Sequence, residues 1–208
     1  MSVILDYYYI GQSPFAYLGH AAIRAVAEKH GAKLHFKPVN LLGLWEVSGA
    51  VMPGQRPLVR QRYRQLELQR MAEWRGLPLN TKPAHFPTDI TLADLCTIAI
   101  IQRGEDPAEY MDAVFRGVWA DEADMGDEAQ IADRLAKCDF DPDSILTAAK
   151  TEDMAAIRAQ NTQDAIAADA VGVPAYVLNG EVFWGQDRIE LVDRALETGR
   201  AAFTSDLG

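Results

Sequence analysis

A serine and a proline stand together where an apolar stretch of the chain gives way to a helical pattern. Ser13 and Pro14 follow the apolar residues 3–10 and precede an amphipathic segment, so Ser13 is expected at the N-cap and Pro14 at the first helical position. A helix N-terminus presents unpaired N–H groups and a partial positive charge, which favour an anion by about 0.3–2 kcal/mol. These residues can therefore hold an anion. The alternative is that Ser13 only caps the helix.

A thiolate is an anion that suits this arrangement, because the pKa of a thiol falls at a helix N-terminus. Lowering that pKa by about two units needs about 2.7 kcal/mol. A hydrogen bond from the Ser13 hydroxyl to a charged group contributes about 1.5–3 kcal/mol, so the hydroxyl and the helix suffice without a base from the protein. Residues 13–16 contain no cysteine and cannot perform dithiol exchange. The thiolate would have to be brought by a ligand.

A second proline precedes another apolar stretch near the end of the chain. Val173 and Pro174 are followed by residues 175–178, which are typical of a strand. A cis bond before Pro174 would leave the N–H and C=O groups of Val173 unpaired toward the site, where a peptide-like ligand could add as a further strand. The alternative is a trans proline at the start of an edge strand, where the missing N–H has no cost.

The segment Gly185-Gln186-Asp187-Arg188 stands where the pattern predicts the final helix to begin. One interpretation is that Gln186 and the helix N–H groups bind a carboxylate, while Asp187 pairs with an α-amino group. A γ-glutamyl group carries both of these charges. In the alternative interpretation Asp187 only caps the helix.

Basic and aromatic side chains offer further contacts for a ligand. Arginines cluster between residues 56 and 64 of an otherwise acidic chain, and this cluster is either a solvated helix face or an anion-binding wall that faces the site. Aromatic surface comes from Trp45, Trp74, Trp184 and the three tyrosines at 7–9, most of which we expect in the core.

The first forty residues predict a βαβ unit. Strands are expected at 3–9 and 34–39, and the helix between them spans about 14–30 and ends at Gly31. A short unit of this kind implies parallel strands and a right-handed crossover.

The middle of the chain is helical, and the end returns to strands. Residues 45–170 show helical spacing without a strand pattern, and the last helix of this part is expected at 154–170. Two short strands follow at 175–178 and 181–184. They are joined by Asn179-Gly180, the strongest local signal for a type I′ hairpin, and a final helix comes after them.

Without the helical middle, this order of elements resembles a thioredoxin core. We therefore predict the α/β class, with a thioredoxin-like domain formed by residues 1–45 and 150–208 and a large all-helical insertion at residues 46–149.

Bulk properties exclude several classes of function. The net charge of −10 and the pI near 4.8 argue against a nucleic-acid partner. No apolar run approaches the roughly 20 residues that span a bilayer, and the N-terminus lacks a signal-peptide pattern. Cys96 and Cys138 lie outside any C-x-x-C motif and are expected as buried thiols, and the histidines show no metal-ligand spacing. We expect a cytoplasmic protein without a membrane segment or a metal.

The motifs together resemble a known family. The sequence is similar to 2-hydroxychromene-2-carboxylate isomerases and their relatives, the kappa-class glutathione transferases, which have a DsbA-like thioredoxin fold. The similarity covers essentially the whole chain, and the first, fourth and fifth of its motifs are the specific ones. In chain order the motifs are Ser13-Pro14-Phe15-Ala16-Tyr17-Leu18-Gly19, Arg60-x-x-Tyr63, Phe86-Pro87, Gly172-Val173-Pro174-Ala175-Tyr176 and Phe183-Trp184-Gly185-Gln186-Asp187-Arg188.

This resemblance implies a role for each residue of the site, with glutathione as the cofactor. Ser13 would be the catalytic residue that faces the glutathione sulfur. Val173 would pair with the glutathione backbone beside a cis Pro174. Gln186 and Asp187 would hold the γ-glutamyl end.

The chain also departs from the family pattern in its first basic segment. Arg60 stands where the family usually has a lysine near the glycyl carboxylate of glutathione, and its geometry differs from that of lysine. The loop at residues 50–56 lacks the asparagine that is usual there. Such a departure can mark a subgroup with another substrate.

By this resemblance the chain is a glutathione-dependent isomerase that acts on a small aromatic or electrophilic molecule in aromatic degradation. The thiolate would attack a conjugated carbon of a bicyclic aromatic carboxylate, the ring would open, a bond would rotate and the thiolate would leave. The alternatives are a kappa-class-like transferase for another electrophile and a non-enzymatic module that binds peptides at the Val173 edge. A thiol–disulfide oxidoreductase lacks the dithiol it would need. The family also implies a homodimer.

Overall fold

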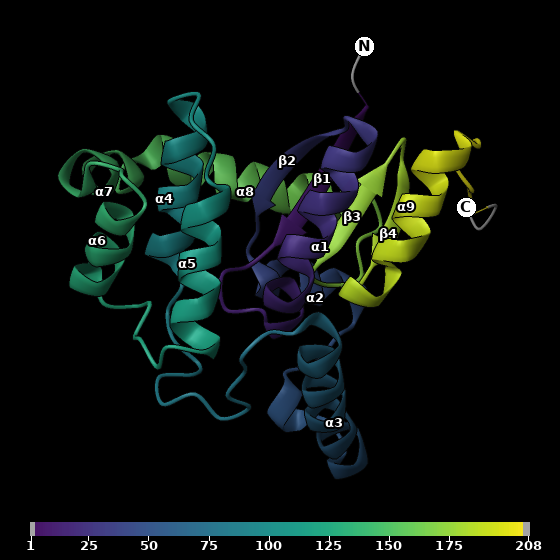
Figure 1. Ribbon diagram of the computed structural model, residues 1–208, viewed down its shortest axis with the longest axis horizontal. Coiled ribbons are helices and arrows are strands. Elements are labelled where there is room, and N and C mark those ends of the chain that lie inside the picture. The colour runs from purple at the N-terminus through teal and green to yellow at the C-terminus, as the bar shows by residue number, and fades with distance from the viewer. Residues whose placement is uncertain (1–2, 206–208) are drawn as a thin grey trace.

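A four-stranded mixed sheet lies at the centre of the computed structural model, which describes residues 3–205 (Figure 1). The βαβ unit and the hairpin are confirmed, with strand bounds within one residue of those predicted. Strand β2 is parallel to β1, whereas β3 is antiparallel to β1 and β4 is antiparallel to β3. The order across the sheet is β2 Lys33–Pro38, β1 Ile4–Tyr9, β3 Ala175–Leu178 and β4 Glu181–Trp184.

Helices supply most of the remaining chain, and α1 (Pro14–His30) shows how the sequence sets their ends. Pro14 begins α1, and Gly31 ends it in the left-handed conformation with φ 61°. The other helices, in chain order, are α2 Leu41–Ser48, the short 3₁₀ helix η1 Pro53–Gln55, α3 Leu58–Arg75, α4 Thr91–Gln102, α5 Ala108–Trp119, α6 Glu128–Lys137, α7 Pro142–Ala149, α8 Glu152–Ala167, the 3₁₀ helix η2 Gln186–Arg188 and α9 Ile189–Thr198.

The two faces of the sheet bury alternate residues of the same strands. Tyr7 and Tyr9 point into the larger apolar core, together with residues of α1 and α9. Tyr8 and Ile10 point into a smaller core that α2 and α8 complete. Figure 1 shows α1 in front of the sheet and α8 behind it. The C-terminal end of β1 and the N-terminal end of α1 are thereby held by packing on both faces of the sheet.

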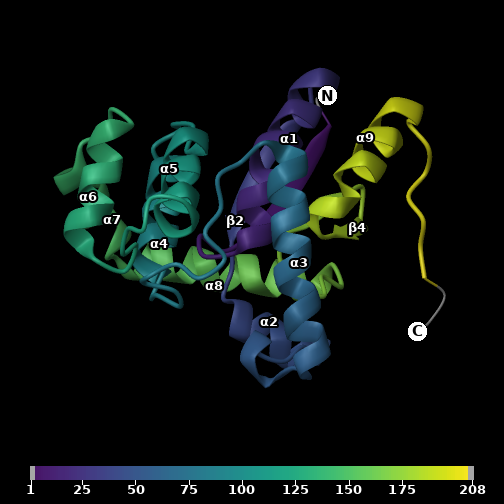
Figure 2. The same ribbon diagram turned by 60° about the horizontal axis from the view of Figure 1, so that its bottom comes forward.

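Helices α4 to α7, called here the helical block, lie beside the sheet, while α2 and α3 project from it (Figure 2). The larger core continues into the block, where the ring of Phe115 on α5 lies 5.8 Å from that of Tyr9. The predicted division into two domains stays a prediction. Its boundary at residues 45–46 falls inside α2, and that at 149–150 falls between α7 and α8.

The remaining local expectations are mostly confirmed. Asn179 and Gly180 both have positive φ, 52° and 84°, as a type I′ turn requires. Residues 45–170 contain no strand. The helix expected at 154–170 ends earlier, at Ala167, because Asp169 turns left-handed and the Ala170 N–H returns to the Ala165 carbonyl. Within residues 3–205, no helix combines the length and the apolar character that crossing a membrane would need.

Candidate functional site

The sheet brings three motifs together, one from the N-terminal part of the chain and two from the C-terminal part. Tyr8 pairs with Ala175, so the residues just before β3 lie beside the loop that follows β1. Ala175 also pairs with Trp184, and the Gly185 N–H donates to the Pro174 carbonyl at 2.8 Å. The segments around residues 13, 173 and 186 therefore meet where β1 ends and α1 begins.

Ser13 caps α1 and keeps a free donor. Its backbone is extended, and its Oγ accepts a hydrogen bond from the Ala16 N–H at 3.2 Å. This contact uses an oxygen lone pair and leaves the hydroxyl proton without a protein acceptor among the described residues. The side chain is buried, with 6% of its residue surface exposed. Capping and anion binding are thus compatible roles for one hydroxyl.

The β1–α1 loop, residues 10–13, is held by the helical block. The Gly11 N–H donates to Oδ1 of Asp94 on α4 at 2.9 Å. The Gln12 side-chain oxygen accepts from the Thr88 N–H at 3.3 Å. A Cβ at Gly11 would lie 2.8 Å from Ile90, so only glycine allows this approach. The position of Ser13 is consequently set by contacts with a distant part of the chain.

Val173 offers an open backbone edge. The Val173–Pro174 bond is cis, as predicted, and Phe86–Pro87 is a second cis bond that the sequence did not indicate. Val173 is partly exposed, and neither its N–H nor its C=O takes part in a backbone hydrogen bond within residues 3–205. An extended ligand can add to this edge by strand pairing.

Gln186 is oriented by an arginine that sequence reasoning missed. Nη2 of Arg75 donates to the Gln186 carbonyl at 3.3 Å and to its Oε1 at 3.4 Å, and it pairs with Glu190 at 3.2 Å. Because Oε1 accepts from Arg75, the Nε2 group of Gln186 is the one without a protein partner in the described chain. Gln186 is 2% exposed, so any ligand contact must occur at the floor of the site.

Asp187 does not cap the final helix, contrary to the alternative interpretation. Its carboxylate is exposed and pairs with Arg188 at 2.7 Å, and neither η2 nor α9 has a side-chain cap. Gly185 before it has φ 103°, and a Cβ there would collide with the Asp187 carboxylate. The turn therefore depends on glycine and presents an acidic group to solvent beside Gln186.

The arginine cluster lies on α3 and in the segment before it. The ion pairs of α3 are formed by Arg70 and Arg75 and leave Arg60 and Arg64 unpaired among the described residues. Burial and the nearby charge of Arg56 lower the pKa of Arg64. The Arg64 guanidinium lies 5.8 Å from the Phe15 ring centroid, whereas Arg60 is exposed.

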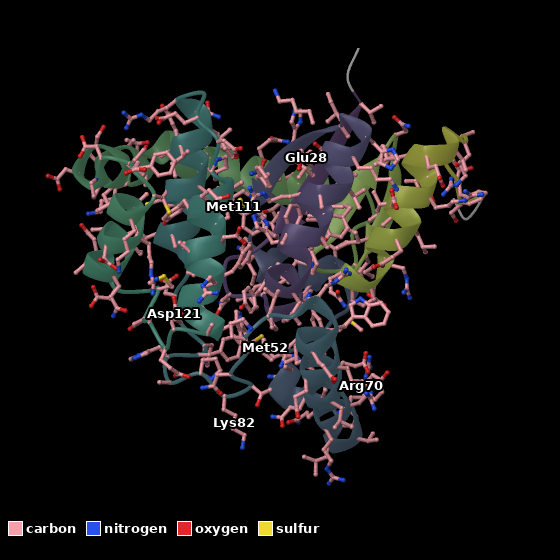
Figure 3. All side chains as sticks on the ribbon, in the orientation of Figure 1. Glu28, Met52, Arg70, Lys82, Met111 and Asp121 are labelled. Atoms are coloured by element: carbon pink, nitrogen blue, oxygen red, sulfur yellow. The ribbon has the colours of Figure 1, made fainter. Side chains whose placement is uncertain are left out.

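Helix α3 has one side that faces the helical block and one that faces away from it. Figure 3 shows Arg70 on the side that faces away from the helical block and Met52, from the segment before η1, on the side toward it. Arg70 pairs with Glu67 at 2.6 Å. Arg70 is thus an ion-paired arginine of α3, whereas Arg60 and Arg64 form no ion pair among the described residues.

Two indole rings flank the open edge. A Cβ at Gly172 would lie 3.1 Å from Nε1 of Trp184 and 3.5 Å from Nε1 of Trp45. Arg56 lies 5.8 Å above the Trp45 ring. The expectation that aromatic residues are mostly core is correct for the tyrosines at 7–9 and wrong for Trp184 and Trp74, which are 53% and 75% exposed.

The two cysteines are free thiols. Cys96 is buried as expected, whereas Cys138 is only partly buried. Burial raises the pKa of Cys96 to about 12, which keeps it protonated. Within the part of the chain that is described, no group of three or more histidine, cysteine or acidic side chains is arranged to hold a metal ion.

Sequence reasoning missed Asp94 and Arg75 because each contacts its partner across a long interval of sequence. Asp94 resembles an ordinary acid in the first turn of a helix, where the helix dipole favours it. Arg75 resembles a basic residue in a last turn. Arg64 belongs to the predicted arginine cluster and lies one turn after Arg60, but the sequence did not distinguish between the two.

Comparisons with known proteins agree on the fold. The family model of the DSBA-like thioredoxin domain matches residues 4–197. A protein from Pseudomonas sp. (strain C18) named 2-hydroxychromene-2-carboxylate isomerase is 30% identical over 200 residues, which cover 93% of this chain and 90% of that protein. One of the same name from Pseudomonas putida is 26% identical over 197 residues, covering 93% and 94%.

Solved structures give the same picture. A structure of a selenomethionine 2-hydroxychromene-2-carboxylate isomerase has a TM-score of 0.81 at 26% identity and covers 94% of this chain and 95% of that one. A probable DsbA oxidoreductase from Streptomyces coelicolor has a TM-score of 0.75 at 16% identity, with coverage of 98% and 93%. The second likeness concerns the fold alone.

Proposed function

The chain belongs to the family of DSBA-like thioredoxin domains, its relatives include 2-hydroxychromene-2-carboxylate isomerases, and on this premise we propose that it is a glutathione-dependent isomerase of that type. The observation that carries the proposal is the free hydroxyl proton of Ser13 at the N-terminus of α1, beside the open edge at Val173. A donor and an extended edge in one place suit a thiol-bearing peptide.

The residues present fit glutathione along its length. The Ser13 hydroxyl and the first N–H groups of α1 would stabilise its sulfur as a thiolate. Val173 would pair with its cysteinyl backbone. The Nε2 group of Gln186 would donate to the γ-glutamyl carboxylate, and the carboxylate of Asp187 would accept from the α-amino group. Each of these groups lacks a competing protein partner or is exposed.

The basic side chains supply the remaining charge. The glycyl carboxylate would lie toward the segment that carries Arg56, Arg60 and Arg64, which form no ion pair in the described chain. These arginines would contact the ligand in place of the asparagine that is usual in the loop at residues 50–56. Bound glutathione would supply a nucleophilic thiolate for reversible addition to a conjugated aromatic carboxylate. The chain itself would orient the sulfur and keep it deprotonated.

Two further properties belong to this proposal. Free thiols at Cys96 and Cys138 support a reducing compartment such as the cytoplasm. A homodimer would cover the apolar side chains that α3 exposes, and light scattering of the purified protein tests it. These side chains include Leu58, Val59, Tyr63, Leu66 and Trp74.

Turnover of 2-hydroxychromene-2-carboxylate with and without glutathione tests the function. The proposal expects the rearranged isomer only when glutathione is present, and a melting temperature that rises with glutathione because the ligand binds the native state. A glutathione conjugate as the product would instead identify a transferase. Absence of both turnover and a thermal shift would contradict the proposal and favour the peptide-binding module.

A further inference from the structure

A buried carboxylate connects the helical block to the loop that carries Ser13. Asp94 lies on the first turn of α4 and is 1% exposed. Its Oδ1 accepts the Gly11 N–H at 2.9 Å, across 83 positions of sequence. The next hydrogen bonds along the loop join the Ser13 N–H to the Ile10 carbonyl and the Ala16 N–H to the Ser13 hydroxyl. Asp94 therefore stands at the start of a short chain of contacts that ends at the Ser13 oxygen.

No side chain fits at Gly11. A Cβ there would lie 2.8 Å from Ile90, 3.0 Å from the Asp94 carboxylate and 3.1 Å from Val114. The backbone is thus pressed against α4 and α5, and its buried N–H has the Asp94 oxygen as its acceptor. A buried donor without an acceptor is costly, so loss of this oxygen would move the loop rather than leave it in place.

The second oxygen of Asp94 makes fewer contacts than expected for a carboxylate with a purely structural role. Oδ2 is buried and has no hydrogen-bond partner, and the nearest cation, Arg158 of α8, is 3.7 Å away. The Arg158 Nε is also buried without a partner. An asparagine has nearly the same size and would keep an acceptor for Gly11, so shape alone does not explain the negative charge.

Several other groups face this carboxylate. They are the Tyr9 hydroxyl from β1, the Tyr110 hydroxyl from α5, and Asp89 and Cys96 along α4 and the segment before it. Arg158 is the cation among them. Burial raises the pKa of Asp94 to about 7 despite Arg158, so the carboxyl changes its charge in the neutral range.

We infer that Asp94 is a positioning residue for Ser13: by accepting the Gly11 N–H it fixes the β1–α1 loop and so sets where the Ser13 hydroxyl meets the sulfur of a bound thiol. The inference rests on the proposed function for its ligand and goes beyond it, since no motif of the sequence indicates Asp94. It also makes the helical block a part of the site rather than a cover for the sheet.

Glutathione titrations of the full chain test this role. Asp94→Leu removes the acceptor and is expected to weaken glutathione binding about tenfold and to raise the pKa of the bound thiol, as loss of a buried hydrogen bond predicts. Asp94→Asn keeps an oxygen for Gly11 and should stay within about twofold of the wild type. The matched control is Thr97→Val, a buried polar residue one turn along α4 whose hydroxyl donates to the Ala93 carbonyl of its own helix.

A double-mutant cycle separates positioning from general destabilisation. If Asp94 acts through Ser13, the effect of Asp94→Leu should shrink to less than about twofold in a Ser13→Ala background. Wild-type affinity in Asp94→Leu, or an undiminished loss in the Ser13→Ala background, would overturn the inference.

Nuclear magnetic resonance gives a readout that does not need a folded leucine variant. In the wild type, the amide signals of both Gly11 and Ser13 should titrate with a midpoint near pH 7, and in Asp94→Asn neither should. A Ser13 signal that stays constant while Gly11 titrates would contradict the role of Asp94. If the wild type binds no glutathione, the proposed function fails, and this titration still decides whether Asp94 acts on Ser13.

Discussion

The Arg64 guanidinium lies 5.8 Å from the centroid of the Phe15 ring, two residues after Ser13. A cation of α3 thereby reaches the N-terminal end of α1. The resemblance to known isomerases points instead to Arg60, which is exposed and one turn earlier. The two arginines can be distinguished, because the Arg64 side chain has a defined contact near the predicted sulfur position, whereas that of Arg60 has no such contact among residues 3–205.

Replacing Arg64 by glutamine should weaken glutathione binding by at least about tenfold, the lower end for one charge-assisted hydrogen bond. Arg60→Gln should have a smaller effect. Arg70→Gln is the matched control, because Arg70 belongs to the same helix, faces away from the helical block in Figure 3 and pairs with Glu67. Calorimetric titration measures all three. A larger loss in Arg60→Gln than in Arg64→Gln would restore the assignment made from the family.

Gly185→Ala should destabilise the fold by about 1–3 kcal/mol, because φ of 103° is strained for any residue with a Cβ. The same Cβ would displace the Asp187 carboxylate, so glutathione affinity should fall as well. Urea denaturation gives the free energy of unfolding. Gly54→Ala serves as the control, since its Cβ would meet open space at an ordinary φ. Equal stability of the two variants would show that the turn at Gly185 is not constrained.

His20 should make the native state sensitive to acid. Burial lowers its pKa from 6.5 to about 3, with the charge of Arg24 as a smaller cause. The unfolded chain binds the proton first, so the stability that neutral His20 contributes is present above pH 6.5 and is lost as the pH falls toward 3. The free energy of unfolding of His20→Gln should therefore fall less steeply over this window than that of the wild type.

The control for this measurement is His85→Gln, which changes an exposed histidine. Asp94 contributes with the opposite sign, because burial raises its pKa from 3.8 to about 7 and its share of the stability is lost as the pH rises through that range. That contribution is common to the wild type and both variants and cancels in the differences. Parallel curves for the wild type and His20→Gln would mean that His20 is not held neutral.

Native Cys96 should resist alkylation. Its thiol is buried, and its pKa of about 12 leaves almost no thiolate at neutral pH. Mass spectrometry after treatment with iodoacetamide should find Cys96 unmodified in the native protein and modified in urea. Rapid native labelling would indicate that α4 opens, and with it the contact between Asp94 and Gly11.

Much of this architecture can be predicted from the sequence because its signals are local. Pro14 and Gly31 mark the ends of α1, and Asn179-Gly180 supplies the positive φ values of the hairpin turn. The cis bond at Pro174 and the convergence of Ser13 with Val173 were predicted through the order of the motifs, and the sheet register places them at one edge.

The supporting contacts could not be predicted in this way. Asp94 meets Gly11 across 83 positions and Arg75 meets Gln186 across 111. Asp94 and Arg75 are charged residues at helix ends, where the helix dipole alone favours an acid in the first turn and a base in the last turn. Their positions in the sequence therefore give no sign of a distant partner. The partner is fixed only when the helical block packs against the sheet. For the same reason the sequence could not distinguish Arg64 from Arg60 as the arginine near the site. The periodicity of α3 does not encode the direction in which this helix projects.

The decisive comparison is between the pKa of the glutathione thiol bound to the wild type and that of the thiol bound to Ser13→Ala. Ultraviolet absorbance of the thiolate across a pH titration gives both values. The account predicts a bound thiol pKa about two units below that of free glutathione, and a rise of at least about one unit in Ser13→Ala, from the loss of one hydrogen bond to a charged sulfur. The same bound pKa in both proteins would contradict it.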